Sequence, residues 1–375
     1  MLRLLAKDQI TNMADRIKVL QFVGTGLKGG VESVVYTYSE ALKDYVEPTF
    51  IFFDNSTNIP YEFIERIGGH YFVVPHVKHL GKFNKAFKKI IKENRFDIIH
   101  SHINTLSVFP LKIAKKCKYP IRIAHSHSQS NKHEFVRNMI KNVLRKFSKK
   151  YATKYLACGI AAGRYQYGDK AFDNGEVTVL RNAIYTNKFV FNQKDRDELR
   201  HELGIMDSEI LVGTIGRLCQ QKNQQYILKI AKLLPEVKFV IVGAGPLEEE
   251  LKQYLLDNNL RNVLFYGISE TPYKFYSAFD TFILPSLYEG VPVTGVEAQT
   301  NGVYTLFSDQ VSEESQASSY VKFLPIEDKD INLWVEELKV PHPHENHLKE
   351  VEDAGFSIDK SSQDWLNIYR QLLEK

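Results

Sequence analysis

The sequence has no apolar run long enough to cross a membrane, and it has only three cysteines in 375 residues. A transmembrane helix needs about 20 consecutive apolar residues. Cys117, Cys158 and Cys219 lie far apart and match neither a metal-binding spacing nor a disulfide framework, which indicates a reducing compartment. The first residues are charged where a secretory signal is apolar. We therefore expect a cytoplasmic protein, either free or bound peripherally to the inner face of the cell membrane.

Several motifs of nucleotide chemistry are also missing. The segment "FVGTGLKGGVESVV" (22–35) has a misplaced third glycine for a G-x-G-x-x-G fingerprint, which argues against a dehydrogenase that binds NAD. The Asp-x-Asp triplets at 195–197 and 328–330 follow no apolar strand, so we interpret them as loop charges and expect no metal-bound nucleotide. No helix-turn-helix, zinc finger or aromatic stacking motif supports nucleic-acid binding.

The overall charge of +4 conceals an asymmetry between the two halves. Residues 1–190 contain 31 Lys and Arg against 15 Asp and Glu, whereas the rest contain 18 against 30. Opposite charges predict two domains with different partners, the first facing something anionic. A basic amphipathic helix is expected over 132–150 and a second basic helix over 82–92. Either an anionic lipid surface or an ordinary core face could receive the apolar stripe of the first.

Apolar β-type runs alternate with helical stretches through both halves, as in "IKVLQFV", "EPTFIFF" and "FDIIHSH" and again in "EILVGTIG", "VKFVIVGAG" and "TFILP". Continuous apolar strands between helices predict parallel sheets covered on both faces. The fold class is therefore α/β, with a Rossmann-like domain over 1–183 and another from 184 onward. The polar, aperiodic segment 183–198 is expected to be the linker. Ligands of such folds sit at the carboxyl ends of the strands, which points to a cleft between facing domains.

Two His-Ser-His pairs end two predicted strands of the first half. Alternation along a strand places His100 with His102, and His125 with His127, on one side. Four histidines could ligate zinc, but no cysteine or carboxylate accompanies them. We expect no metal here and favour hydrogen bonding or catalysis next to an anionic substrate.

Glycines and cations follow other strands. Gly29 and Gly30 precede a helix start, where the backbone can approach a phosphate or a sugar, although a plain turn is the alternative. Gly243 lies in a similar strand-to-helix turn. Arg217 and Lys222 follow a strand in the acidic half, and two cations at that place suit a diphosphate.

The segment "SLYEGVPVTGVEAQ" (286–299) contains two glutamates eight positions apart. Glu289 is expected at the end of the strand "TFILP", and Glu297 in the second turn of the next helix. Gly290, Val291 and Pro292 open that helix, whose positive end favours a phosphate. Two carboxylates that flank a phosphate site suit a nucleotide sugar, which has hydroxyls at both ends and a diphosphate between them.

This segment resembles the E-x7-E signature of the retaining glycosyltransferases of family 4, which have the GT-B fold of two Rossmann-like α/β/α domains facing across a cleft. The resemblance extends over nearly the whole chain, through "GGVES", both "HSH" pairs, "ACGIAAGRYQYG", "VLRNAIYTNKF", "GRLCQQKN", "GAGPL" and "LPSLYEGVP". It is greatest to bacterial enzymes of capsule and exopolysaccharide assembly. "TNGVYTLFSD" departs from the usual Gly-x-Pro after the second glutamate, and "RNAIY" departs from Asn-x-Ile-Asp.

The resemblance implies a role for each matching residue. Glu289 contacts the donor sugar and Glu297 the ribose hydroxyls, while Arg217 and Lys222 hold the diphosphate with the amides of Gly290 and Val291. Gly29 and Gly30 approach the donor phosphates from the other domain. His125 matches the active-site histidine of the family, with His127 as the reserve candidate. Residues 184–360 bind the nucleotide sugar, residues 1–183 bind the acceptor, and a final helix over 361–375 crosses back to the N-terminal domain.

The sequence thus predicts a retaining hexosyltransferase that needs no metal or other cofactor. The donor would be a UDP-sugar and the acceptor a lipid-diphosphate-linked oligosaccharide at an anionic membrane. A GT-B epimerase that acts on the UDP-sugar without an acceptor is the alternative. A tandem Rossmann dehydrogenase and a non-enzymatic basic binding module fit the two glutamates and the paired cations less well.

Overall fold

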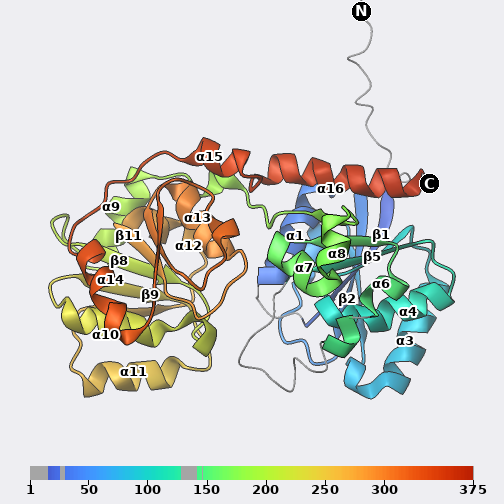
Figure 1. Cartoon of the computed structure of the whole chain (residues 1–375), viewed down its shortest axis with the longest axis horizontal. Helices are drawn as coiled ribbons and strands as arrows, with labels where there is room; N and C mark the ends of the chain where they lie inside the picture. The colour runs from blue at the N-terminus through green and yellow to red at the C-terminus, as the bar shows by residue number, and fades with distance from the viewer. Residues whose placement is uncertain (1–15, 26–29, 128–141, 146, 375) are drawn as a thin grey trace, which may run out of the picture. The chain divides into compact units, whose positions relative to one another are not determined.

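The computed structural model describes residues 16–25, 30–127, 142–145 and 147–374. The chain divides into two compact units (Figure 1). Unit 1 consists of Met1–Leu180 and Ile358–Lys375, and unit 2 of Arg181–Ser357. The sequence placed its divisions after residues 183 and 360. Each unit is described by itself.

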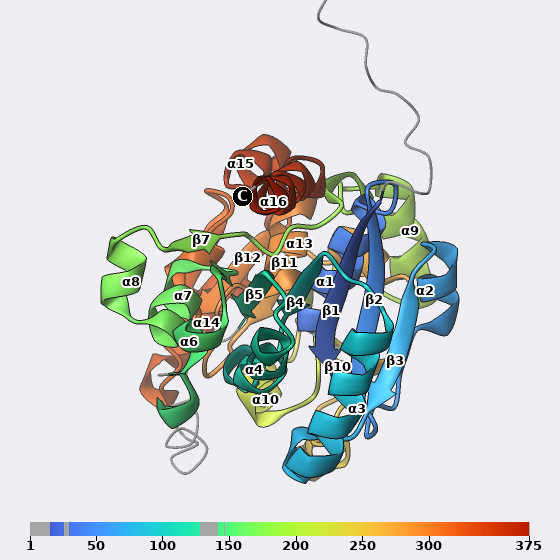
Figure 2. The same ribbon diagram turned by 90° about the vertical axis from the view of Figure 1, so that its right-hand side faces the viewer.

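Unit 1 is built on a seven-stranded parallel sheet in the order β3-β2-β1-β4-β5-β6-β7, and Figure 2 shows several of its strands side by side. Its strands are β1 (Ile17–Gly24), β2 (Val46–Phe53), β3 (His70–Val74), β4 (Ile98–Ser101), β5 (Ile121–Ser126), β6 (Lys154–Ala157) and β7 (Val177–Val179). Its helices include α1 (Gly30–Ala41), α2 (Tyr61–Arg66), α3 (Leu80–Glu93), α4 (Val108–Lys116), α6 (Ser148–Tyr151), α7 (Ile160–Tyr167), α8 (Asp169–Asp173) and α16 (Ile358–Leu373).

Unit 2 repeats the architecture with a six-stranded parallel sheet in the order β10-β9-β8-β11-β12-β13. Its strands are β8 (Leu211–Ile215), β9 (Lys238–Val242), β10 (Val263–Gly267), β11 (Thr281–Leu284), β12 (Tyr304–Ser308) and β13 (Val321–Leu324). Its helices include α9 (Gln193–Glu202), α10 (Gln224–Leu233), α11 (Glu248–Asp257), α12 (Pro272–Ala278), α13 (Val293–Asn301), α14 (Ile331–Leu338) and α15 (Leu348–Asp353). The prediction of two Rossmann-like domains is confirmed.

The strand orders create a switch point in each sheet. In unit 1 the chain moves outward from β1 to β2 and β3, then returns to place β4 on the other side of β1. In unit 2 it moves from β8 to β9 and β10, then places β11 on the other side of β8. Helices that leave such a point in opposite directions open a crevice beyond the carboxyl ends of the two central strands, where ligands of α/β proteins bind. The loops after β1, β4, β8 and β11 are therefore the places to look for a site.

Two local predictions are wrong. The segment 183–198 is not an aperiodic linker, because it contains the short 3-10 helix η4 (Thr186–Lys188) and the first residues of α9. The side chain of Asn192 caps α9 by accepting a hydrogen bond from the backbone amide of Asp195 at 3.1 Å. The triplet 195–197 accordingly lies inside a helix and not in a loop.

The basic helix expected over 132–150 lies partly outside the described residues. Within that range the structure describes helical residues 142–145 and the helix α6. The other basic helix, α3, is fully described. Its apolar side chains Phe83, Phe87 and Ile91 are buried in the core of unit 1, while its lysines are exposed. Its apolar stripe is thus already used by the core. No helix in the described part of the chain is long and apolar enough to span a membrane.

The last helix, α16, belongs to unit 1 although the chain reaches it only after unit 2 (Figure 1). Its Trp365 is 1% exposed and stacks at 4.2 Å on the ring of Tyr38 from α1. Its Tyr369 is fully buried and hydrogen-bonds at 2.7 Å with Nδ1 of His100 on β4. These contacts pack the C-terminal helix on the core of unit 1.

We expect Trp365→Ala to lower the free energy of unfolding of unit 1 by about 3–5 kcal/mol, because it leaves a cavity between α16 and α1. Urea unfolding followed by circular dichroism measures the change. Leu373→Ala is the control, since Leu373 lies on the same helix but is 43% exposed. Equal losses for the two variants would contradict the role assigned to the tryptophan.

Candidate active site

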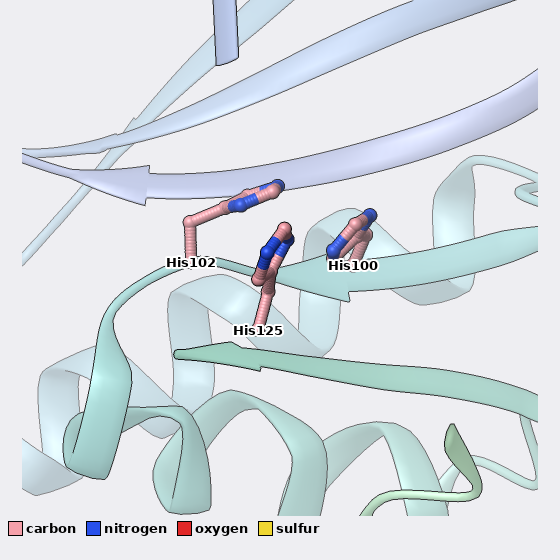
Figure 3. A group of neighbouring side chains, drawn as sticks. All are labelled: His100, His102 and His125. Carbon is pink, nitrogen blue, oxygen red and sulfur yellow. The ribbon is translucent and has the colours of Figure 1, made fainter. Parts of the chain in front are cut away.

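A cluster of histidines occupies the switch point of unit 1. His100 lies on β4, His102 just after it and His125 on β5, and Figure 3 shows their rings side by side. The ring centroids of His100 and His102 are 4.1 Å apart, as are those of His125 and His127. The prediction that each pair shares one side is confirmed. The structure adds that the two pairs meet, with 5.3 Å between the rings of His100 and His125.

Two residues that the sequence did not single out hold the cluster. The side-chain oxygen of Gln21, on β1, lies 2.7 Å from Nε2 of His102, and Gln21 donates to the Tyr369 hydroxyl at 3.2 Å. His102 Nδ1 lies 3.0 Å from Nε2 of His127. Since Gln21 Oε1 only accepts, His102 carries its proton on Nε2, and Nδ1 accepts from His127. One chain of hydrogen bonds therefore runs from α16 through Gln21 to the end of β5.

Burial keeps the cluster neutral. Loss of solvation and the neighbouring imidazoles lower the pKa of His100, His102 and His125 well below the usual value, and burial lowers that of His127 to about 3. His125 is 1% exposed, whereas His127 is only partly buried. His127 is therefore the member of its pair that lies nearer the surface.

The cluster has some features of a metal site. A ring nitrogen of each of His100, His102 and His125 lies within 4.8 Å of the others. However, the rings of His100 and His125 stack nearly parallel, at 14°, and ligand lone pairs lie in the ring plane. Both nitrogens of His102 already have hydrogen-bond partners. This arrangement suits a packed stack of imidazoles better than convergence on one ion.

The glycine turn after β1 is described only in part. Gly29 lies outside the described residues. Gly30 is the first residue of α1, and a Cβ added there would meet no atom of the described residues within 4 Å. The backbone at this helix start is therefore open to a ligand. Glu32, in the first turn of α1, is buried, and burial raises the pKa of its carboxyl to about 7.

At the switch point of unit 2, two loops are joined by an ion pair. Lys222 Nζ, in the loop after β8, lies 2.7 Å from Glu289 Oε1, in the loop after β11, and the side chains are only 16% and 12% exposed. Three further hydrogen bonds tie the loops: the side chain of Gln221 donates to the Tyr288 carbonyl at 3.0 Å, that of Asn223 to the Pro285 carbonyl at 3.1 Å, and the Leu287 amide to the Gln221 carbonyl at 2.8 Å. A predicted cation and a predicted carboxylate are thus brought into direct contact.

Glu289 does not end a strand, contrary to expectation. β11 ends at Leu284, and Glu289 forms an isolated parallel bridge with Val311 in the loop after β12. The Ser315 hydroxyl also donates to the Gly290 carbonyl at 2.9 Å. The segment is fixed by its neighbouring loop, and the helix α13 begins only at Val293, with Pro292 as its cap residue. Gly290, Val291 and Pro292 therefore precede the helix, whose first amides lack intrahelical acceptors.

Glu297 lies in the second turn of α13, as predicted. Its Oε2 accepts a 2.6 Å hydrogen bond from the hydroxyl of Tyr276 on α12. Burial raises the pKa of Glu297 to about 7, against the opposing effects of Tyr276 and of nearby Lys188. Tyr276 lies in none of the motifs, and Lys188 lies within "VLRNAIYTNKF" but has no role assigned by it.

The remaining predicted residues of unit 2 have different surroundings. Arg217 follows β8 and is exposed, so its guanidinium is available to a ligand. Gly243, at φ +132°, lies against the next loop, and a Cβ there would come within 2.0 Å of the Gly216 carbonyl oxygen. Close packing of two loops by itself explains this glycine.

A groove of about 1020 Å³ opens at the amino ends of the strands of unit 1, which is the end of the sheet opposite to the histidine cluster. Its lining includes Lys18, Glu47 and His70, which stand at the amino ends of β1, β2 and β3. Ligands of open α/β sheets bind at the other ends of the strands. The groove thus lies away from both switch points.

Comparison with known proteins agrees with this geometry. Residues 28–188 match the model of Glycosyltransferase Family 4, and residues 195–339 match that of Glycosyl transferases group 1. EpsF of Bacillus subtilis (strain 168), named as a candidate glycosyltransferase, is 30% identical over 96% of this chain and 97% of its own. The UDP-Gal:alpha-D-GlcNAc-diphosphoundecaprenol alpha-1,3-galactosyltransferase of Escherichia coli is 27% identical over 67% of each chain. The capsular polysaccharide biosynthesis glycosyltransferase CapH of Staphylococcus aureus is 23% identical over 78% of this chain and 83% of its own.

Solved structures share the fold. Alr3699/HepE of Anabaena, solved in complex with UDP, superimposes with a TM-score of 0.74 at 17% identity over 95% of this chain and 100% of its own. The same protein was also solved with UDP-glucose. The sucrose-phosphate synthase of Thermosynechococcus elongatus gives a TM-score of 0.75 at 16% identity, over 96% of this chain and 100% of its own. At these identities the likeness concerns the fold alone.

The neutral histidine cluster predicts a stability that falls in acid. Histidines in the unfolded chain take up protons as the pH drops below about 6.5, while those of folded unit 1 do not. The free energy of unfolding should therefore decrease below that pH by up to about 1.4 kcal/mol per pH unit for each histidine. Thermal unfolding between pH 7.5 and pH 5 measures the slope. His125→Gln should make it shallower, whereas exposed His79→Gln should leave it unchanged. Identical slopes in all three proteins would contradict the assignment.

Proposed function

The chain belongs to the family 4 glycosyltransferases and has the GT-B fold, and we propose that it moves a hexose from a UDP-sugar to a lipid-linked saccharide with retention at the anomeric carbon. The observation that carries the proposal is the position of Lys222, Glu289 and Glu297 around the switch point of unit 2. The name of CapH, a capsular polysaccharide biosynthesis glycosyltransferase, supports a role in the assembly of a cell-surface polysaccharide such as a capsule or an exopolysaccharide.

The donor fits the chemistry of this site from end to end. The carboxylate of Glu297 accepts hydrogen bonds from the ribose hydroxyls, and Glu289 accepts them from the sugar. Lys222, exposed Arg217 and the amides around Gly290, Val291 and the start of α13 hold the diphosphate between them. UDP and UDP-glucose bound to Alr3699/HepE support a uridine donor.

Departure of the diphosphate needs stabilisation, because negative charge accumulates on its oxygen as the bond to the sugar breaks. Fixed cations and helix-terminal amides stabilise that charge without rearrangement. These groups do the work that a divalent metal does in other enzymes, so we propose that transfer is independent of metals and other cofactors. The acceptor hydroxyl then attacks the face that the diphosphate leaves, and its proton passes to the departing diphosphate oxygen.

In unit 1 we propose that the histidine pair at the end of β5 takes part in binding the donor sugar. His127 is the less buried of the two, and its backbone amide donates a 2.7 Å hydrogen bond to the side-chain oxygen of Asn104. It would contact the donor sugar directly. His125 would act from behind, as the neighbour that fixes the ring of His127. The open backbone at Gly30 would approach the donor phosphates, with Gly29 beside it in sequence.

Binding measurements test the donor site. We expect UDP to bind with the same affinity with and without magnesium, and to bind at least about tenfold more weakly to Lys222→Ala and Glu297→Ala, each of which removes a charged hydrogen-bonding group. Isothermal titration calorimetry gives the affinities. Lys229→Ala is the matched control, because Lys229 forms an ion pair of equal length, 2.7 Å, with Asp328 in the same unit.

Absence of UDP binding, or equal losses in all three variants, would overturn the assignment. Product analysis then separates two reactions at one site. A transferase releases UDP in an acceptor-dependent manner, whereas an epimerase converts the UDP-sugar without any acceptor.

The proposal for the acceptor is based on the positive charge of unit 1. We propose that basic unit 1 docks on anionic lipid, where a lipid-diphosphate-linked oligosaccharide would be the acceptor, as the name of the Escherichia coli relative suggests. The exposed lysines of α3 form a described part of that surface. Because Phe83, Phe87 and Ile91 are committed to the core, α3 would meet the membrane through charge and not by insertion.

We expect sedimentation with liposomes to require anionic lipid and to weaken with salt. Each lysine near an anionic surface contributes about 1 kcal/mol, so the quadruple change to glutamine at Lys85, Lys88, Lys89 and Lys92 should abolish most of the binding. The control makes the same charge change on exposed lysines of unit 2, at Lys232, Lys252, Lys329 and Lys339. Binding to neutral vesicles, or equal effects of both variants, would refute docking through α3.

A further inference from the structure

The carboxylate of Glu297 is held from inside unit 2 by one residue. The Tyr276 hydroxyl donates to Oε2 at 2.6 Å, and it is the only hydrogen-bond partner recorded for this side chain in the described part of the chain. Glu297 itself is partly exposed, while Tyr276 is completely buried. One carboxylate oxygen therefore faces a fixed donor in the core, and the other is left for a ligand.

Tyr276 has little freedom to move. Its ring packs against Phe189 at 6.1 Å and Phe282 at 5.6 Å. Its backbone carbonyl lies 3.1 Å from Nε2 of His344. Next to it in sequence, the Ser277 hydroxyl accepts a hydrogen bond from the side-chain amide of Asn301 at 3.0 Å, which joins α12 to α13. The hydroxyl thus occupies a position set by the core and by the contact between the two helices.

We propose that Tyr276 is the positioning residue for recognition of the nucleotide ribose: its hydroxyl fixes one oxygen of Glu297 so that the other accepts the hydrogen bonds of the 2′ and 3′ hydroxyls. The inference rests on the proposed role of Glu297 in donor binding. A carboxylate anchored at one oxygen loses less rotational freedom when a ligand binds, so more of the binding free energy is retained.

The electrostatics of the pair act in the same direction. Burial and the neighbouring carboxylate raise the pKa of Tyr276 well above its usual value, so the phenol remains a donor. Its hydrogen bond opposes the effect of burial on Glu297, and so does the charge of Lys188 from η4. On α15, which packs against α13, Glu350 and Glu352 are bonded elsewhere, to Ser319 and Thr186. Without the phenol, the pKa of Glu297 rises further and less of it is ionised at neutral pH.

Tyr276→Phe tests the proposal with two ligands. We expect it to weaken UDP binding about tenfold at pH 7, the effect of losing one hydrogen bond to a charged group. Affinity for 2′,3′-dideoxy-UDP should be the same in the variant and the wild type, because this ligand has no hydroxyls for Glu297 to accept from. The loss for UDP should diminish at pH 8.5, where Glu297 is ionised again. In turnover, the KM for the donor should rise while kcat changes little.

The chain offers a matched control in Tyr304→Phe. Tyr304 also donates to a carboxylate, that of Glu337, at 2.9 Å. However, it lies at the amino end of β12, whereas the proposed site lies at the carboxyl ends of the strands. It should lose a similar amount of stability in thermal unfolding and none of its affinity for UDP. In a Glu297→Gln background, where residue 297 cannot ionise, Tyr276→Phe should no longer alter the pH dependence.

The outcomes separate the two levels of the argument. Failure of the wild type to bind UDP, or of Glu297→Ala to weaken it, would overturn the donor site and this inference with it. If Glu297→Ala weakens UDP binding but Tyr276→Phe does not, or if Tyr276→Phe weakens UDP and dideoxy-UDP equally, the donor site stands and the positioning role is refuted.

Discussion

The ion pair between Lys222 and Glu289 is the contact on which the geometry of the proposed donor site depends. It joins loops that leave different strands, and each charge is mostly removed from water. Either charge alone at this position would carry a large desolvation cost, whereas together they compensate each other. The pair also places the lysine where a diphosphate would need it. A more highly charged anion could then compete with the carboxylate for the same ammonium group, and Glu289 would exchange the lysine for the sugar hydroxyls from which it is proposed to accept hydrogen bonds.

The histidine cluster of unit 1 follows a different rule. It is polar but uncharged, because burial of the imidazoles, three of which pack against Trp365, disfavours their protonated forms. Gln21 donates to the Tyr369 hydroxyl and accepts from Nε2 of His102, which fixes the nitrogen of His102 that carries the proton. The switch points of the two units thus differ. That of unit 2 contains a pair of opposite charges, and that of unit 1 contains neutral imidazole rings.

The sequence predicted the central strands of both sheets because strands buried on both faces are continuous apolar runs, as in β1 and β11. It missed the edge strands β3 and β13, which are half-exposed and lack that pattern, and it missed α9, whose capping residue was read as part of a linker. For the proposed site, motif spacing singled out Glu289, Glu297 and Lys222. It could not identify Tyr276, Gln21 or Tyr369, because their importance comes from contacts between segments distant in sequence. Pairing of Lys222 with Glu289 was equally beyond a reading of local pattern.

The position of α16 has a consequence for how the molecule is made. Unit 2 is one continuous stretch, so a ribosome delivers all of it before it delivers the last element of unit 1. Until α16 emerges, Tyr38 and the rings of His100 and His102 lack the tryptophan and tyrosine that cover them. Unit 2 can therefore fold completely before unit 1. Unit 1 lacks its last helix until translation ends. Its exposed apolar surface during that interval is where chaperones would act and where a truncated chain would aggregate.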